Sequence, residues 1–251
     1  MSTHRTVIPL LEADPELGEG LSPAEEEAAA RALVAHARTL EAGPWDPHEE
    51  RWPAEPAIGL LVLDGVLTRD IVFVGRTTTE LLGSGDLLRP WDDDVQFEPL
   101  PFEVAWHVHE PARVAVLDAR FALATARWPA LAGAVSRRHI RRARSLAFQL
   151  AIAQLPRVDD RLLVLLWALA ERWGRVCPHG VRLPLRLPHR TLATLVGARR
   201  PSVTTALSGL SRDGLVERTE DGWMLHGDPT VELPKRLHAP VSSAASSAFG
   251  A

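Results

Sequence analysis

The sequence has a single cysteine and no long hydrophobic run, and both absences limit what the protein can be. Cys177 alone excludes an intrachain disulfide framework and any cluster held by several thiolates of one chain. The longest apolar run, residues 162–170, is far too short to span a bilayer. No hydrophobic signal segment follows Met1, so we expect a cytoplasmic protein with no membrane partner.

The familiar sequence motifs of catalysis are also missing. The chain contains no Gly-rich phosphate loop, no nucleophile elbow and no zinc-protease motif. With 46% hydrophobic and 24% charged residues, a chain of 251 residues can bury real hydrophobic cores and form two domains. We therefore expect a globular protein that is not an enzyme and holds no cofactor or metal.

Charge is distributed unevenly along the chain. Residues 1–118 hold 8 arginines and 23 acidic residues, and 8 − 23 gives −15. Residues 119–251 hold 20 basic and 9 acidic residues, and 20 − 9 gives +11, so the two parts sum to the net charge of −4. A basic C-terminal half is the electrostatic pattern expected of a protein that binds nucleic acid.

The C-terminal half contains the pattern of a winged helix-turn-helix between residues 187 and 226. Residues 189–196 have apolar side chains at helical spacing, and Gly197 follows where a helix can end in a left-handed residue. Pro201 then favours the first turn of a second helix. Asp221-Gly222 is typical of a tight hairpin, which predicts a wing of two strands after that helix.

The second helix of this motif is predicted to enter the major groove of DNA. Val203, Leu207 and Leu210 form its buried stripe, and the opposite face is polar and free of acid. A helix of this kind reads bases near its N-terminal end, while the hairpin lies along the DNA backbone. The candidate DNA-binding residues are His189, Arg190, Arg199, Arg200, Pro201, Ser202, Thr204 and Thr205.

The N-terminal half predicts a lead-in segment, one helix and a small β-domain. Residues 1–21 are rich in proline and glycine, and Ser22-Pro23 is a helix start that predicts a helix to about Ala37. From residue 58 to 117, short β-like runs alternate with turn residues, including a turn at Asp64-Gly65. Many short strands at regular spacing indicate a small β-barrel or sandwich.

A long helix is predicted from residue 121 to 155. Small and aliphatic side chains recur on one line of it at 3-4-3 spacing, which is typical of a contact with a partner helix. The candidate dimerisation residues are Ile140, Ala143, Ala147 and Leu150. Five arginines between 137 and 144 crowd the other faces, and they are either solvated or directed at the acidic β-domain or an anionic ligand.

The order of these elements resembles the Crp/Fnr family of bacterial transcription regulators over nearly the whole chain. The likeness is most specific at residues 192–207, and residues 60–66 and 81–88 resemble the family's β-roll core. It implies an α+β fold with a cyclic-nucleotide-binding-like β-roll at 1–118, a dimerisation helix at 119–156, a winged helix at 157–230 and a tail at 231–251. It further implies a homodimer on palindromic double-stranded DNA, with RNA polymerase as a possible additional partner.

Two parts of the sequence depart from the family's pattern. Members typically read bases with an Arg, an adjacent Glu and an Arg one turn later, and these positions are Arg200, Pro201 and Thr205 here. Members that bind cAMP hold its phosphate with an Arg-Ser or Arg-Thr pair, where this chain has Phe102-Glu103. Because a carboxylate repels a phosphate, we expect that cAMP is not the ligand.

The effector itself stays open at this point. The candidate pocket residues are Arg89, Trp91 and Glu103, and the neighbouring run at 92–94 is acidic. The same fold sensing another small molecule, haem or a redox signal is one alternative. A metal-dependent, cupin-like β-barrel enzyme is another, because His107 and His109 lie on one face of a predicted strand beside Glu110.

Overall fold

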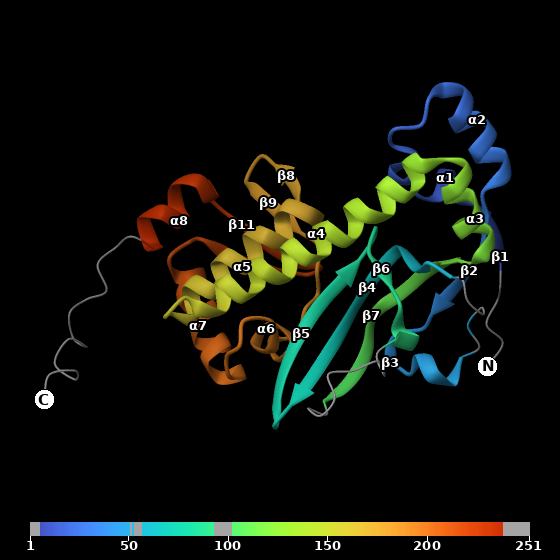
Figure 1. Ribbon diagram of the computed structural model, residues 1–251. Coiled ribbons are helices and arrows are strands. Elements are labelled where there is room, and N and C mark those ends of the chain that lie inside the picture. The colour runs from blue at the N-terminus through green and yellow to red at the C-terminus, as the bar shows by residue number, and fades with distance from the viewer. Residues whose placement is uncertain (1–5, 51, 53–56, 93–101, 238–251) are drawn as a thin grey trace, which may run out of the picture. The chain divides into compact units, whose positions relative to one another are not determined.

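The computed structural model describes residues 6–50, 52, 57–92 and 102–237, which form two compact units (Figure 1). The N-terminal unit comprises residues 1–148 and the C-terminal unit residues 149–251. We predicted a separate segment at 119–156, whereas the division falls inside a single long helix, α4 (Pro129–Gln154).

The described part of the N-terminal unit contains a seven-stranded antiparallel sheet. Its strands are β1 (Thr6–Pro9), β2 (Val34–Leu40), β3 (Gly43–Trp45), β4 (Gly59–Phe73), β5 (Arg76–Gly83), β6 (Leu87–Leu88) and β7 (Glu103–Leu117). They run in the order β1-β2-β7-β4-β5, with β3 paired to β7 and β6 paired to β4. The prediction of a β-domain in this half is confirmed.

Strands β4 and β7 are longer than the sequence pattern predicts. The expected turn at Asp64-Gly65 is wrong, because β4 continues through these residues and its pairing with β7 shifts register there. Gly65 has φ +90°, and a Cβ at this position would lie 2.5 Å from the Ala112 Cα. A glycine that permits close backbone approach therefore marks an irregularity in the ladder and not a chain reversal.

Helices and short 3-10 turns accompany this sheet. They are α1 (Leu10–Ala13), η1 (Pro15–Gly18), α2 (Pro23–Ala32), η2 (Pro47–Glu49), η3 (Pro90–Asp92), α3 (Ala119–Arg127) and the first part of α4. Helix α2 begins as predicted, with Ser22 and Glu25 forming a capping box. The segment predicted as a lead-in has regular structure that the sequence did not predict, namely β1, α1 and η1.

Two of the predicted helices have different limits. The helix expected to reach Ala37 ends at Ala32, because residues 34–40 form β2 and pair with both β1 and β7. The helix expected from 121 to 155 is interrupted at Trp128, which has φ −126° and ψ 89°. Pro129 follows it, and the residue before a proline avoids the helical region. Two helices, α3 and α4, therefore replace the single predicted one.

Two clusters of buried side chains hold the N-terminal unit together. The first joins the helices to the sheet through residues such as Leu10, Leu17, Phe121 and Leu131. The second lies on Leu60, Leu67, Val108 and Val114, and four tryptophans join it: Trp45, Trp52, Trp91 and Trp106. Each fully buried leucine contributes roughly 1.5–3 kcal/mol to folding, so these clusters fix the sheet and the start of α4.

The C-terminal unit combines helices with a four-stranded antiparallel sheet in its described part (Figure 1). Its elements are α5 (Val158–Trp173), β8 (Arg175–Cys177), β9 (Gly180–Leu183), α6 (His189–Leu195), α7 (Arg200–Arg212), β10 (Val216–Thr219), β11 (Gly222–Leu225) and α8 (Pro229–Leu237). The strand order is β10-β11-β9-β8. The predicted helix-turn-helix and hairpin are confirmed, and β9 also pairs with the hairpin.

Helix α8 is the element of this unit that the sequence pattern missed. We assigned residues 231–251 to a tail, yet residues 229–237 are helical despite an internal proline, Pro234. Contacts with α5 and α7 hold this helix in place, and such contacts between distant parts of the chain leave no local sequence signal.

Candidate nucleic-acid interface

Helices α6 and α7 are joined by a tight turn at Gly197-Ala198. Gly197 has φ +62°, and the Ala198 amide donates to the Ala193 carbonyl at 2.8 Å. Val203, Leu207 and Leu210 of α7 are buried, which fixes the rotation of α7 about its axis. The opposite side of α7 consequently faces solvent.

The predicted DNA-binding residues gather on and beside this solvent-facing side. Arg199 is the N-terminal flanking residue of α7, and Arg200 and Pro201 begin the helix. The exposed members of the predicted set are Arg190, Arg199, Arg200, Pro201, Ser202, Thr204 and Thr205, while His189 is half-buried. Neither Arg199 nor Arg200 forms an ion pair with a residue in the described part of the chain, so both guanidinium groups are available to an anion.

Hydroxyl groups along α7 are satisfied by the helix itself. Thr204, Thr205 and Ser208 each donate to the backbone carbonyl four residues earlier, at 3.0–3.2 Å. This leaves the hydroxyl oxygens as acceptors. At positions 204 and 205 the threonine methyl groups add small apolar contacts, which suit the methyl group of thymine.

His189 at the start of α6 is coupled to α7. Its Nδ1 lies 3.0 Å from the Thr204 Oγ1, and the Thr204 hydroxyl proton is already directed at the Arg200 carbonyl. The His189 Nδ1–H therefore donates to Thr204, and Nε2 is the unprotonated nitrogen of the neutral ring. Burial holds the pKa of His189 below its ordinary value, and the charges of Arg218 and Arg200 lower it further.

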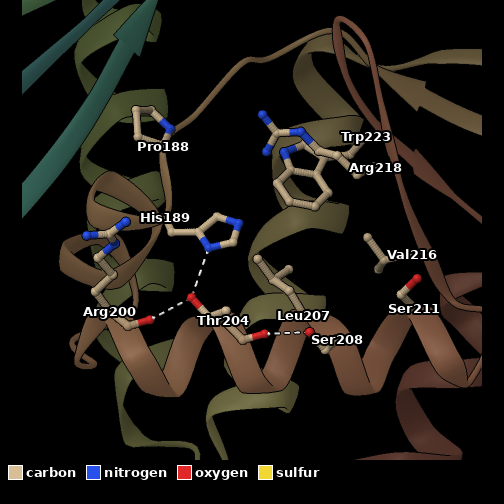
Figure 2. A pocket seen from close by; sticks show the side chains of 10 residues that line it. All are labelled: Pro188, His189, Arg200, Thr204, Leu207, Ser208, Ser211, Val216, Arg218 and Trp223. Atoms are coloured by element: carbon tan, nitrogen blue, oxygen red, sulfur yellow. Dashed lines mark hydrogen bonds between the residues drawn. The ribbon is translucent and has the colours of Figure 1, made fainter.

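A groove with a volume of about 710 Å³ lies between α7 and the wing hairpin β10–β11 (Figure 2). Its polar lining comes from His189, Arg200, Thr204, Ser208, Ser211 and Arg218. Its apolar lining comes from Pro188, Leu207, Val216 and Trp223. None of the described residues that line the groove is acidic, so it is a positively charged recess beside the predicted reading helix.

Arg218 and Trp223 face each other across the wing hairpin. They are partners in the β10–β11 ladder, and the Arg218 guanidinium carbon lies 4.6 Å from the centre of the indole ring. Trp223 is 3% exposed, and its Nε1 has no hydrogen-bond partner among the residues that the structure describes. Neither residue was predicted from the sequence, because strand pairing brings them to the groove.

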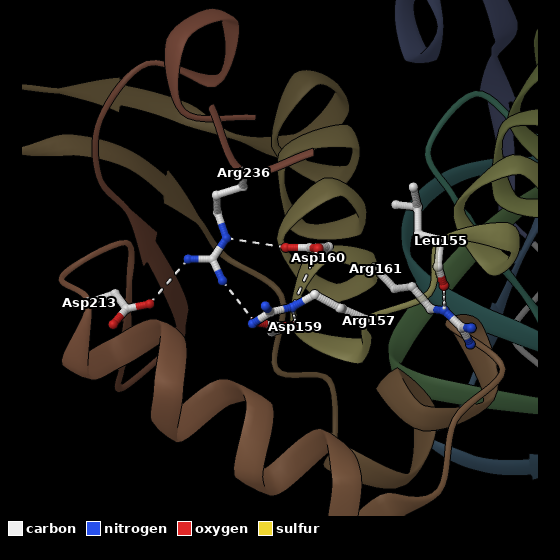
Figure 3. A network of polar contacts seen from close by, with 7 residues as sticks. All are labelled: Leu155, Arg157, Asp159, Asp160, Arg161, Asp213 and Arg236. Carbon is white, nitrogen blue, oxygen red and sulfur yellow. Dashed lines mark hydrogen bonds and ion pairs between the residues drawn. The ribbon is translucent and has the colours of Figure 1, made fainter. Parts of the chain in front are cut away.

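A polar network holds the elements behind the interface together (Figure 3). Arg236 of α8 contacts Asp159 at 2.8 Å and Asp160 at 3.2 Å at the start of α5, and Asp213 at 3.1 Å at the end of α7. Arg157 also contacts Asp159 at 2.6 Å. This hydrogen bond is the main reason that the pKa of Asp159 lies below its ordinary value.

The predicted dimerisation residues lie on an exposed side of α4. Ile140 is 52% exposed and Leu150 is 68% exposed, and Ala143 and Ala147 between them are exposed as well. This line of four residues, the α4 stripe, runs along one side of the helix at 3-4-3 spacing.

Arginines on the other side of α4 bind the β-domain. Arg138 donates to Asp14 at 2.6 Å and to the Gly85 carbonyl at 2.7 Å, and its side chain is 2% exposed. Arg142 binds Glu80 through two hydrogen bonds. Of the two alternatives open for these arginines, contact with the acidic β-domain is therefore confirmed for Arg138 and Arg142.

The predicted effector residues are only partly brought together. Arg89 donates to the Ala57 carbonyl and lies over Trp91, which packs against Trp52 at a ring distance of 5.5 Å. Glu103 is exposed at the start of β7, opposite Val72. Asp93 and Asp94 lie outside the described residues.

The two histidines considered as metal ligands contact each other and a neighbouring threonine. The rings of His107 and His109 lie 4.9 Å apart, and His109 Nε2 is 3.2 Å from the buried hydroxyl of Thr68. Burial, followed by the neighbouring His107, lowers the pKa of His109. Within the described ranges, no three His, Cys, Asp or Glu side chains gather as a metal site would require.

None of the described helices is long and apolar enough to cross a membrane.

Part of the C-terminal unit matches a known domain family. The model of the Crp-like helix-turn-helix domain matches residues 160–228. No curated protein sequence matches the chain.

Solved structures share the fold over most of the chain. A CooA mutant from Carboxydothermus hydrogenoformans is 18% identical with a TM-score of 0.63, and the match covers 93% of this chain and 98% of that one. FixK2 from Bradyrhizobium japonicum is 16% identical with a TM-score of 0.58, covering 82% and 96%. The regulator CLP from Xanthomonas campestris, described as responsive to c-di-GMP, is 20% identical with a TM-score of 0.53, covering 77% and 95%.

The domain match assigns DNA binding to the C-terminal unit, and the structural matches assign the fold to the chain as a whole. Residues 160–228 are thus a Crp-like helix-turn-helix domain, and the chain shares its fold over most of its length with solved regulators such as CLP.

Proposed function

We propose that the protein acts as a homodimer on a two-fold symmetric DNA site and does so without cAMP. Helix α7 of each subunit would read one half-site, with Arg200 contacting a guanine and Arg199 a backbone phosphate. The observation that carries this assignment is the exposed, acid-free side of α7, where both arginines lack an ion-pair partner in the described part of the chain. Half-sites about one helical turn apart follow from such a dimer.

The homodimer proposal rests on the two sides of α4. The arginines that bind the β-domain, Arg138 and Arg142, lie on one side of the helix, and the α4 stripe lies on the opposite side. An exposed line of small and aliphatic residues suits close packing of a second helix. Because the first side is engaged within the subunit, the α4 stripe is the side that remains for a second copy.

Independence from cAMP rests on the charges around the expected nucleotide site. Phe102-Glu103 stands where cAMP-binding relatives carry a phosphate-binding Arg-Ser or Arg-Thr pair, and Arg89 is already engaged with Ala57 and Trp91. In the turn at residues 83–86, the Gly85 carbonyl accepts from Arg138 and the Asp86 carboxylate accepts from the Gly83 amide at 2.8 Å. The arginines of α4 thus bind the β-domain through the protein's own acids and carbonyls, with no nucleotide required.

Selection of bound duplexes from a random pool tests the DNA-binding half of this proposal. We expect a two-fold symmetric consensus from the purified protein alone. Recovery of unrelated sequences would contradict specific binding.

Calorimetry with cAMP and cGMP at millimolar concentration tests the proposed independence from cyclic nucleotides. We expect no saturable binding and no change in affinity for the selected duplex. A tenfold rise in DNA affinity with cAMP would overturn independence, and the Arg89→Ala variant would then show whether Arg89 holds the phosphate. Affinity that appears only with another small molecule or haem would favour a different effector.

A further inference from the structure

The groove between α7 and the wing hairpin has the size and charge of a site for DNA backbone. Its volume of about 710 Å³ exceeds what a lone phosphate fills and leaves room for an attached sugar. Its rim carries the cation of Arg218 on one side and the ring of His189 on the other, as Figure 2 shows. The floor between them is apolar, with Leu207 and Trp223.

The tip of the wing is unsuited to a phosphate. It carries Glu220 and Asp221, and acids at the tip of a hairpin repel a DNA backbone. Asp221 is held by Arg182 and by the Thr219 hydroxyl at 3.2 Å, which keeps the acid at this position. A backbone contact is therefore favoured behind the tip, where Arg218 faces the groove.

Arg218 is free to serve such a contact. It is exposed and forms no ion pair with any residue that the structure describes, and its planar guanidinium lies on Trp223. A guanidinium stacked in this way is oriented before an anion arrives and can bind two phosphate oxygens at once. The Nε1–H of Trp223 beneath it is buried and has no hydrogen-bond partner among the residues that the structure describes.

His189 supplies a complementary group from the opposite wall. Its Nδ1 is engaged by Thr204, and Figure 2 shows the other ring nitrogen directed toward the groove. A neutral ring offers a lone pair there, and a protonated ring offers an N–H. An anion in the groove thus favours the protonated form.

We propose that this groove binds one deoxyribose-phosphate unit of duplex DNA, with Arg218 and His189 contacting the phosphate and with Leu207 and Trp223 packing against the sugar. The inference rests on the proposed DNA binding and adds the site of one particular backbone contact. Arg218 contributes this contact from strand β10 of the wing, whereas Arg199 and Arg200 lie at the N-terminal end of α7.

Neutral replacement of single phosphates tests the assignment. Methylphosphonates are placed one at a time along the selected duplex, and binding is measured with wild type, Arg218→Gln and Arg218→Lys. At one phosphate in each half-site, we expect the neutral linkage to weaken wild type by roughly tenfold and to have little further effect on Arg218→Gln. Arg218→Lys keeps the charge and should keep most of the sensitivity.

A matched control comes from the same unit. Arg172 lies 4.3 Å from the ring centre of Trp173 on α5, away from the groove, and Arg172→Gln should respond to every methylphosphonate as wild type does. The salt dependence gives a second readout, since Arg218→Gln should flatten the slope by about one unit per half-site. Trp223→Phe, which keeps the apolar ring and removes the N–H, should weaken binding less than Arg218→Gln.

Two outcomes separate this inference from the proposed function. If wild type and Arg218→Gln respond alike to every methylphosphonate while both bind the duplex specifically, the groove holds no phosphate and specific DNA binding stands. If wild type binds no duplex specifically, the proposed function fails and this inference fails with it.

Discussion

Arg142 and Glu80 form a two-point ion pair, with Nε 2.6 Å from Oε1 and Nη2 2.8 Å from Oε2, between residues 62 positions apart. The Glu80 side chain is 7% exposed, and Arg142 also donates to the Leu87 carbonyl at 2.9 Å. Helix α4 is therefore fastened to strands β5 and β6 by one side chain.

Arg142→Gln should lower the free energy of unfolding, because it leaves a buried carboxylate with weaker compensation. Arg69 stays within 3.8 Å of Glu80, so we expect a loss of about 1–3 kcal/mol, less than for a fully orphaned charge. Urea unfolding followed by circular dichroism measures it. Arg137→Gln is the control on the same helix, since Arg137 and Glu19 form an exposed pair at 3.5 Å, and it should cost under about 1 kcal/mol. Equal losses would mean that the Arg142–Glu80 pair contributes no more to the free energy of unfolding than the exposed Arg137–Glu19 pair.

Glutamates on the α4 stripe should convert a dimer into a monomer. In Ala143→Glu with Ala147→Glu, like charges would meet across the helix pair, and burying them is costly. Sedimentation at micromolar concentration gives the mass. Ser145→Glu adds the same charge to an exposed position off the stripe and should remain dimeric. A monomeric wild type would refute the interface.

The two arginines at the start of α7 should affect DNA binding differently. Arg200→Ala should cost roughly 1–3 kcal/mol and relax the preference at one base in each half-site, because a bidentate contact to guanine is lost. Arg199→Ala should weaken all duplexes alike and flatten the salt dependence. Binding to a panel of single-base variants distinguishes the two. The same loss of specificity from both changes would show that the roles are assigned wrongly.

DNA affinity should rise as the pH falls from about 7.5 to 6. The pKa of His189 is below its ordinary value in the free protein, mainly through burial and then through Arg218 and Arg200, and a bound phosphate should raise it. Protons are then taken up on binding, and each unit of pKa difference adds about tenfold in affinity across the window between the two values. His189→Gln should remove this dependence.

Stability of the free protein should change in the opposite direction. A histidine whose pKa is lowered on folding stabilises the protein above the unfolded pKa near 6.5, and that stabilisation is lost as the pH falls. Thermal unfolding without DNA, measured beside the binding curves, checks the sign. A pH dependence that persists in His189→Gln would assign the proton to another group.

Arg236→Ala should destabilise the C-terminal unit by about 1–3 kcal/mol. The change removes three ion pairs, and among the described residues it leaves the buried Asp160 with Arg157 alone, at 3.7 Å. The pKa of Asp159 is lowered, so this stabilisation is present above the ordinary carboxyl pKa and is lost as the pH falls through the lower folded value. Lys235→Ala, which breaks an exposed pair with Glu232 on the same helix, is the control. The difference in the free energy of unfolding between Arg236→Ala and Lys235→Ala, measured by urea unfolding, should become small at acidic pH.

Local sequence signals predicted the helix-turn-helix because its parts are near neighbours. The turn at Gly197, the apolar stripe of α7 and the hairpin at Asp221-Gly222 are each determined within a few residues. The same local logic failed at Asp64-Gly65, where a turn-like pair continues a strand because β7 pairs alongside. It also failed after Ala32, where pairing with β1 and β7 ends the helix in favour of β2.

The candidate site was predictable only where it lies on the helix-turn-helix. The exposed residues of α7 follow from helical periodicity, whereas Arg218 reaches Trp223 through strand pairing. Similarly, Arg138 and Asp14 form a hydrogen bond although they lie 124 positions apart, and no local sequence pattern near either residue predicts this contact.

The position of Arg236 has a practical meaning for anyone isolating the DNA-binding half. The stretch that matches the family's domain runs from 160 to 228, and a fragment cut to those limits begins at Asp160 and ends before α8. Such a fragment keeps Asp160 and Asp213 but discards the guanidinium that binds both. The limits of sequence likeness therefore leave out a helix that belongs to the same compact unit.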